Sequence, residues 1–138
     1  MKKLLLILFF SSLFAQNYTL KIITTNLKNN KGVVQFNIYN NPKNFPDKKL
    51  TLYFKKGINT IKNKTSSFTF NLPKGRYLVS VLHDENKNGK IDKGLMLTKE
   101  GIGVSNYKSF SLFNRPNFKK GSFILDKDKT IKIKVNYF

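Results

Sequence analysis

The stretch LPKGRYLVSVL, residues 72–82, decides the fold that the sequence predicts. Pro73 and Gly75 are typical of a tight turn, because proline fixes one backbone angle and glycine tolerates angles that other residues avoid. After the turn, every second residue is aromatic or β-branched, which predicts a strand with these side chains on one face: Tyr77, Val79 and Val81. The stretch therefore predicts a turn that leads into a strand of a packed core.

The same period of two runs through most of the chain. Alternating segments occur at YTLKIIT (18–24), VVQFNIY (33–39), LTLYF (50–54), FTFNL (68–72) and TIKIKVNY (130–137). Asparagine, glycine and proline residues separate them, and no segment after the N-terminus shows a sustained helical stripe. The sequence therefore predicts an all-β, two-sheet antiparallel sandwich of seven to eight strands, each with one apolar face.

Residues 1–15 have the composition of a secretory signal peptide. Two lysines precede an apolar run at Leu4–Phe10, and the small residue Ala15 closes the segment. The run is shorter than the about 20 residues that cross a bilayer. We expect cleavage after Ala15, which leaves 16–138 as a single periplasmic or secreted domain without a transmembrane segment. An uncleaved anchor is the alternative, because Leu13 stands where a small residue is preferred.

The chain is strongly basic and has no cysteine. Its formal net charge is +19, and loss of the two N-terminal lysines lowers it to +17. Without cysteine the fold has no disulfides and rests on its core. The charge favours an anionic envelope polymer as a partner, although evenly spread lysines also serve solubility alone. Another envelope protein is a second candidate partner, and export argues against nucleic acid.

The 72–82 stretch resembles the turn and strand of transthyretin-like (prealbumin-like) sandwich domains, which include carboxypeptidase regulatory-like modules. The chain also resembles a bacterial exported family called domain of unknown function 2141. The resemblance rests on GVVQFNIYNNPKNFP (32–46), LPKGRYLVSVLHDENKNGKID (72–92), KEGIGVSN (99–106) and RPNFKKGSF (115–123). It implies an exported transthyretin-like sandwich of unknown activity. Members often carry more acid in the 84–92 loop and are usually less basic than this chain.

The segment DENKNGKID, residues 84–92, has the spacing of a calcium loop. EF-hand loops supply oxygens from positions 1, 3, 5, 7 and 9 and need glycine at position 6. Counted from the first aspartate, Gly89 takes position 6 and the ligands are Asp84, Asn86, Asn88, the carbonyl of Lys90, and Asp92. Position 12 is Leu95 and not an acid, so Glu100 would have to close the site. The spacing predicts at most a weak calcium site; a polar turn that bonds its own backbone is the alternative.

No motif predicts catalysis. His83 is the single histidine, no cysteine accompanies it, and no serine stands in a nucleophile context. We expect His83 to be a structural residue at a strand end, and the protein to be a non-enzymatic binding or structural module without a certain cofactor. A hydrolase that uses His83, Asp84 and Glu100 is the rival. KEGIGVSN is predicted as a loop, with glycines for unusual backbone angles.

Overall fold

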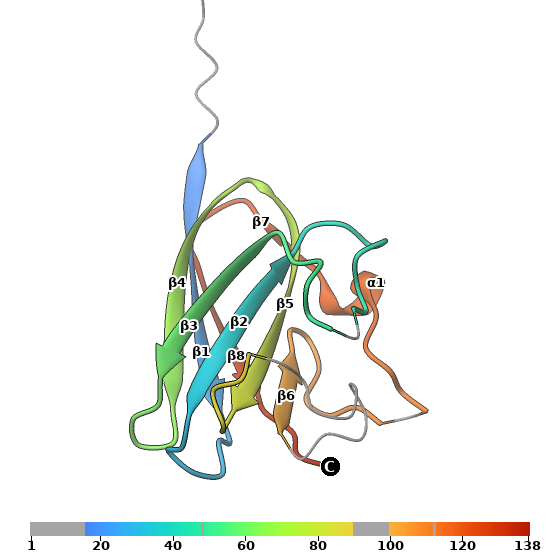
Figure 1. Cartoon of the computed structure of the whole chain (residues 1–138). Helices are drawn as coiled ribbons and strands as arrows, with labels where there is room; N and C mark the ends of the chain where they lie inside the picture. The colour runs from blue at the N-terminus through green and yellow to red at the C-terminus, as the bar shows by residue number, and fades with distance from the viewer. Residues whose placement is uncertain (1–15, 48, 90–99, 112) are drawn as a thin grey trace, which may run out of the picture.

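The computed structural model describes residues 16–47, 49–89, 100–111 and 113–138, which form eight strands and one helical turn (Figure 1). The predicted signal peptide, residues 1–15, lies outside the described residues. The elements follow in this order: β1 (Asn17–Thr25), β2 (Val33–Tyr39), β3 (Lys55–Thr60), β4 (Ser66–Pro73), β5 (Gly75–Asp84), β6 (Gly101–Val104), α1 (Phe118–Gly121), β7 (Phe123–Leu125) and β8 (Lys129–Lys134). Within the described part, no helix is long and apolar enough to cross a bilayer.

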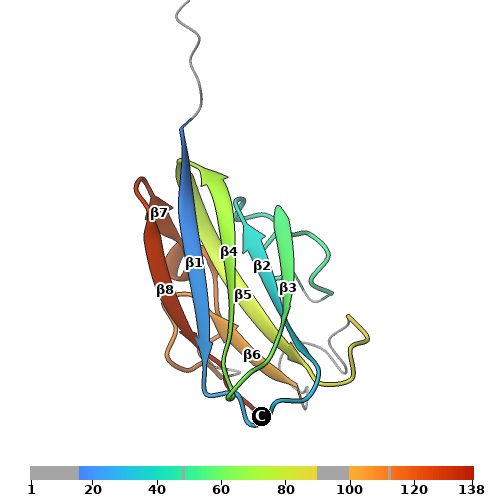
Figure 2. The same ribbon diagram turned by 90° about the vertical axis from the view of Figure 1, so that its left-hand side faces the viewer.

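The strands form two sheets that pack face to face (Figure 2). One sheet has the order β4-β1-β8, and the other has the order β3-β2-β5-β6, with β7 paired to the start of β5. All neighbours are antiparallel except β1 and β8, which run parallel from the pair of Leu20 and Lys129 onward. The predicted all-β, two-sheet sandwich of seven to eight strands is therefore confirmed, with one parallel pair in it.

The inner core lies between the two sheets and is built from alternate residues of their strands. The 72–82 block contributes as predicted, because Tyr77, Val79 and Val81 are at most 4% exposed. The hydroxyl of Tyr77 donates to the carbonyl of Pro73 at 2.7 Å, which closes the turn before β5. Side chains from both sheets complete this core: Leu20, Ile22, Val34, Phe36, Ile38, Phe70, Leu72 and Ile133.

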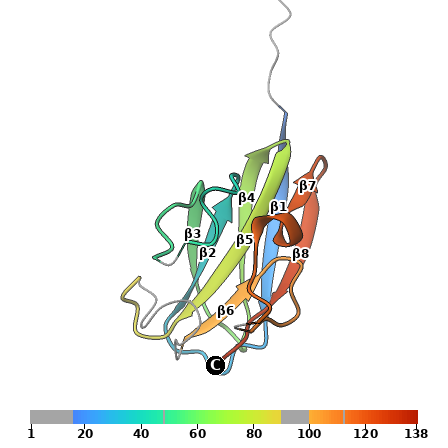
Figure 3. The ribbon, with the colours of Figure 1, turned by 90° about the vertical axis from the view of Figure 1, so that its right-hand side faces the viewer.

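Strands β2 and β5 are buried on both faces, which corrects the expectation of one apolar face per strand. Leu78 and Leu82 of β5 point away from the inner core and are nevertheless 0% exposed. They belong to a second apolar cluster with Tyr39 of β2 and with side chains from the segments that flank the sheet: Phe45, Leu50, Phe110 and Phe118. Figure 3 looks onto this face, with α1 in front of β5. The segments 40–54 and 105–122 therefore supply a second core on the outside of the larger sheet.

The sides of the sandwich are closed by close contacts between strands of different sheets. On one side, β6 meets the end of the chain through paired hydrogen bonds of Ile102 with Asn136, at 2.8 and 2.9 Å. A Cβ at Gly101 or Gly103 would lie 2.4–2.6 Å from side chains of Val135 or Ile133. The prediction that these glycines serve unusual backbone angles in a loop is wrong, since both lie in strand β6 and are needed for close approach.

Candidate functional site

The predicted calcium loop begins where β5 leaves the sheet. Asp84 is the last residue of β5 and is 2% exposed. Its Oδ1 accepts the backbone N–H of Asn88 at 3.2 Å, and its Oδ2 accepts that of Gly89 at 2.7 Å. Gly89 has a φ of +70°, which glycine adopts readily. The buried carboxylate therefore folds the chain back into a tight turn.

This turn brings two of the predicted ligands together. The Oδ1 of Asn86 accepts the same N–H of Asn88 at 3.2 Å, so an oxygen of Asn86 lies close to the carboxylate of Asp84. Two further predicted ligands, Lys90 and Asp92, lie outside the described residues. Among the residues that the structure describes, no three His, Cys, Asp or Glu side chains are grouped so that they could hold a metal ion. The turn thus has the glycine at position 6 and the oxygens of positions 1 and 3 close together. These oxygens accept backbone N–H groups, as in the alternative of a polar turn that bonds its own backbone.

A second acid, Glu100, stands one position beyond the paired residues of β5 and β6. His83 pairs with Gly101 across β5 and β6, so the next position places Glu100 opposite Asp84 where the two strands separate. Both side chains leave the sheet on the outer face, and Glu100 is 5% exposed. Opposite residues of an antiparallel pair have Cβ atoms about 4.5–5.5 Å apart. The register therefore directs Glu100 toward the end of β5 that carries Asp84.

Glu85 takes a different direction from these two acids. Its Oε1 lies 2.9 Å from Nζ of Lys28, which comes from the connection between β1 and β2. Burial raises the pKa of Glu85, but the hydrogen bond and the charge of Lys28 outweigh this effect, so the pKa lies below its ordinary value of 4.5. Glu85 therefore ties the loop to the β1–β2 connection and is not directed at Asp84.

His83 has a structural environment on the inner face. Its side chain is 0% exposed. The hydroxyl of Tyr137 lies 2.7 Å from Nδ1, and the carbonyl of Lys31 lies 2.8 Å from Nε2. Since a carbonyl only accepts, Nε2 donates to Lys31, and in the neutral imidazole Nδ1 then accepts from Tyr137. The Tyr137 hydroxyl in turn accepts the backbone N–H of Lys28 at 3.0 Å.

His83 and the two carboxylates do not converge. Neighbouring residues of a strand point to opposite faces, so the imidazole of His83 lies inside and the carboxylate of Asp84 lies outside. Both nitrogens of His83 are already engaged with Tyr137 and Lys31. The strand alternation puts Asp84 and, by register, Glu100 on the face opposite to His83, the third member of the rival hydrolase set.

Gly32 is a residue of this site that sequence reasoning did not single out. It has a φ of +74°, and a Cβ on it would lie 2.0 Å from the carbonyl oxygen of Asp84. The turn before β2 therefore rests directly on the end of β5. The run Asn29-Asn30-Lys31-Gly32 signals a turn, but nothing in it indicates what the turn packs against. Tyr137 was also missed as the partner of His83, although the alternation of the last strand places it inward.

Comparison with known proteins identifies a family. A family model covers residues 22–134, and its description reads "Uncharacterized protein conserved in bacteria (DUF2141)". No curated protein and no solved structure matches the chain. The matched range includes the turn at Asp84 and Glu100, so the candidate site lies within the part that the family shares.

Proposed function

This chain belongs to the DUF2141 family of bacterial proteins, and from that premise we propose that it is an exported, non-enzymatic β-sandwich module of the cell envelope that binds calcium weakly. The site is the turn after β5 together with Glu100. Export is supported by residues 1–15, whose lysines, apolar run and small terminal residue have the order of a signal peptide. The block at 72–82 supports a transthyretin-like sandwich as its scaffold.

The observation that carries the calcium proposal is the burial of two acids, Asp84 and Glu100, which the register of β5 and β6 puts opposite each other where these strands separate. In a chain of net charge +19, such a pair is the local exception. Asn86 adds a neutral oxygen beside Asp84. Few charged ligands and many nearby lysines keep the affinity low, in the about 10⁻⁴ to 10⁻³ M range of extracellular modules or weaker. Calcium would fix the turn in place and perform no chemistry.

Calorimetric titration and thermal unfolding test this proposal. At a calcium concentration about ten times the dissociation constant, the fold should gain about 1.4 kcal/mol. We expect Glu100→Gln and Asp84→Asn to abolish the heat and the rise in Tm. Asp126→Asn, which removes an exposed acid from another turn, is the matched control and should titrate like the parent. Absence of heat and of a Tm shift in the parent at millimolar calcium would leave the polar turn as the correct interpretation.

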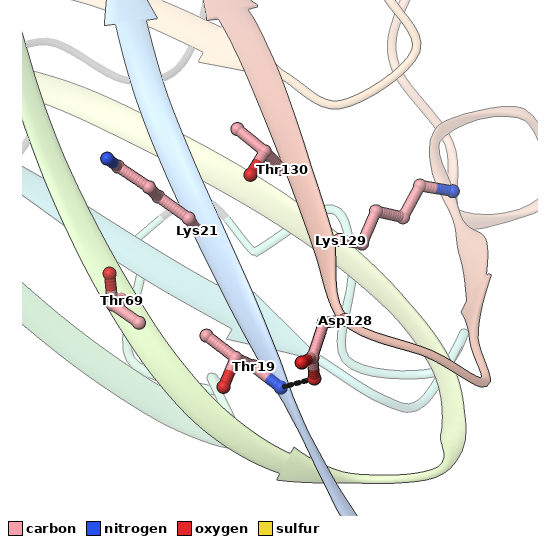
Figure 4. Close-up of a pocket in the computed structure, with 6 residues that line it drawn as sticks. All are labelled: Thr19, Lys21, Thr69, Asp128, Lys129 and Thr130. Carbon is pink, nitrogen blue, oxygen red and sulfur yellow. Dashed lines mark hydrogen bonds between the residues drawn. The ribbon is translucent and has the colours of Figure 1, made fainter.

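A second candidate function, binding of an anionic envelope polymer, is favoured by a groove on the smaller sheet. The groove has a volume of about 300 Å³ and lies on the outer face of β4-β1-β8 (Figure 4). Thr69, Lys21 and Thr130 form one row across the three strands. The ammonium of Lys21 and the threonine hydroxyls are donors for carboxylate or phosphate groups.

The remaining lining residues are partly engaged within the protein. Asp128 accepts the backbone N–H of Thr19 at 2.9 Å. The ammonium of Lys129 points away from the groove and lies 5.1 Å from the ring centre of Phe123 (Figure 4). Lys21 is therefore the side chain to test.

Binding to alginate, a polymer of uronic acids, tests the polymer candidate. Lys21→Gln should weaken binding severalfold, whereas Lys108→Gln, an exposed lysine outside the groove, should not. Binding should also weaken steeply with added salt. Equal losses in the two variants would assign the binding to net charge and not to the groove.

A further inference from the structure

Exposed apolar side chains gather along one edge of the larger sheet. Seven large hydrophobic side chains are exposed among the described residues, and four of them lie in the short range 52–58: Leu52 at 52%, Tyr53 at 36%, Phe54 at 43% and Ile58 at 51%. Single exposed apolar residues are ordinary, but a group of them marks an interaction surface. With the two lysines between them, we call these residues the β3 rim: Leu52, Tyr53, Phe54, Lys55, Lys56 and Ile58.

The backbone holds the β3 rim in place. The carboxylate of Asp47 accepts the backbone N–H groups of Lys49, Thr51 and Leu52, which fixes the segment that leads into β3. The N–H of Phe54 donates to the carbonyl of Ile38 at 2.6 Å. The Phe54 ring stacks on Tyr77 at a centroid distance of 6.4 Å. The exposed side chains therefore project from a fixed edge.

Strand β3 is the outer strand of its sheet, so the rim is accessible from the side. Figures 2 and 3 place β3 and β7 on opposite sides of the molecule. Lys55, which stays exposed, and Asn59 also extend toward β4 and donate to the carbonyls of Asn71 and Ser67, at 3.4 and 2.7 Å. These bonds cover the free edge of β4 and leave the β3 rim as the exposed feature of this side.

The charge around the rim has one sign. Between Asp47 and Asp84 the sequence contains no acidic residue, while basic residues stand at 48, 49, 55, 56, 62, 64, 74 and 76. Asp47 itself is 7% exposed, and backbone N–H groups surround its carboxylate. Lys55 lies 6.0 Å from the ring centre of Phe54, and Lys56 lies 5.8 Å from that of Tyr53. The rim therefore presents aliphatic, aromatic and cationic groups together.

This combination matches the surface of an anionic membrane. Aromatic side chains favour the boundary between headgroups and hydrocarbon, and each lysine near anionic headgroups strengthens binding about fivefold. A sugar ligand would explain the aromatic rings but not the exposed aliphatic side chains of Leu52 and Ile58. A partner strand on the β3 edge is opposed by its lysines, which commonly protect edges from such pairing. We propose that the β3 rim docks the protein onto an anionic phospholipid bilayer.

A tryptophan reporter tests the docking directly. The chain has no tryptophan, so Tyr53→Trp gives a single signal from the rim. Phe113→Trp, at a fully exposed position outside the rim, is the matched reporter. With vesicles of equimolar phosphatidylglycerol and phosphatidylcholine, the emission of Tyr53→Trp should shift to the blue and that of Phe113→Trp should not. With pure phosphatidylcholine neither should shift. A chelator in the buffer removes any contribution from the proposed calcium turn.

Substitutions in the reporter chain separate docking from general charge attraction. Leu52→Ser with Ile58→Ser should weaken vesicle binding about tenfold or more, because apolar area is removed from the contact. Ile124→Ser is the control, since Ile124 is also 51% exposed but lies on β7. Lys55→Gln with Lys56→Gln should reduce binding to anionic vesicles severalfold. Residues 1–15 are common to all variants. An unshifted Tyr53→Trp emission, or equal binding of the Leu52/Ile58 and Ile124 variants, would overturn the proposal.

Discussion

The outer faces of the two sheets differ in what covers them. The outer face of β4-β1-β8 is uncovered in Figure 2 and carries exposed polar residues such as Thr19, Lys21 and Thr69. The outer face of β2 and β5 is buried under the segments 40–54 and 105–122. Asp84, Glu100 and the β3 rim lie at the end or edge of the covered sheet, whereas the groove with Lys21 lies on the uncovered one. The difference teaches that the covered sheet gains a second core from connecting segments, while the uncovered sheet leaves its polar side chains open to solvent.

The largest expected effect comes from removing a side chain of the second core. Leu82→Ala should cost about 2–5 kcal/mol of unfolding free energy, because a fully buried leucine leaves a cavity. Thr69→Ala, on the uncovered face, should change stability by less than about 0.5 kcal/mol. Unfolding in urea measures both changes. Similar small effects for the two variants would mean that the segments over β5 add little to stability, and the comparison between the faces would fail.

The uncovered face is the part of the fold that sequence predicts best. On β1, apolar Leu20 and Ile22 alternate with exposed Thr19 and Lys21, as the period of two requires. On β2, however, Gln35 and Asn37 occupy the positions of a solvent face and are at most 1% exposed. Polar side chains at these positions indicate a solvent face, although segments outside the strand, 40–54 and 105–122, cover this side of the sheet. Strand periodicity reports one face at a time and contains no information about what packs on the other.

The sequence indicates the turn of the candidate site and names Glu100 as the residue to close it, but it does not indicate the packing that supports the turn. The turn at Asp84, with oxygens and a glycine at fixed spacing, follows from short-range chemistry. The position of Glu100 beside Asp84 depends on the register of β5 with β6, and the support from Gly32 depends on the packing of another turn. Such contacts join residues far apart in the chain, so spacing alone does not reveal them.

A pair of glycines provides the second test, of intermediate size. Gly32 and Gly89 share a positive φ, of 74° and 70°, but a Cβ on Gly89 meets nothing within 4 Å. Gly89→Ala should cost about 1 kcal/mol for the backbone conformation alone. Gly32→Ala should cost about 3 kcal/mol, because the new methyl group also collides with the backbone of Asp84. Urea unfolding measures both.

The same variants compare two turns: that of Gly32, which packs on the end of β5, and that of Gly89, which extends away from the sheet. Equal losses of unfolding free energy in the two variants would show that backbone strain alone sets the loss. The contact between Gly32 and the end of β5 would then relax easily. Gly32→Ala should in addition weaken any calcium signal, since the end of β5 carries Asp84. Retention of the parental calcium response in a folded Gly32→Ala variant would separate the turn from its support.

The smallest expected effect concerns Glu85, the acid that is directed away from the covered face. Its pKa is lowered by Lys28 despite the opposing effect of burial, so the folded state favours the charged form. The ion pair therefore stabilises the fold above the unfolded pKa of about 4.5, and this contribution is lost as the pH falls through the lower folded pKa. Because both side chains are partly exposed, the contribution is about 0.5 kcal/mol at low salt.

Urea unfolding of the parent and Glu85→Gln from about pH 7 to about pH 3 should show a difference that disappears at the acid end. Lys28→Gln should remove the same pH-dependent increment, together with a pH-independent loss from its contact with the Tyr137 ring, 5.0 Å away. A difference between the parent and Glu85→Gln that persists unchanged at low pH would show that Glu85 acts through packing. Glu85 and Asp84 would then differ in where their side chains lie and not in how their charges act.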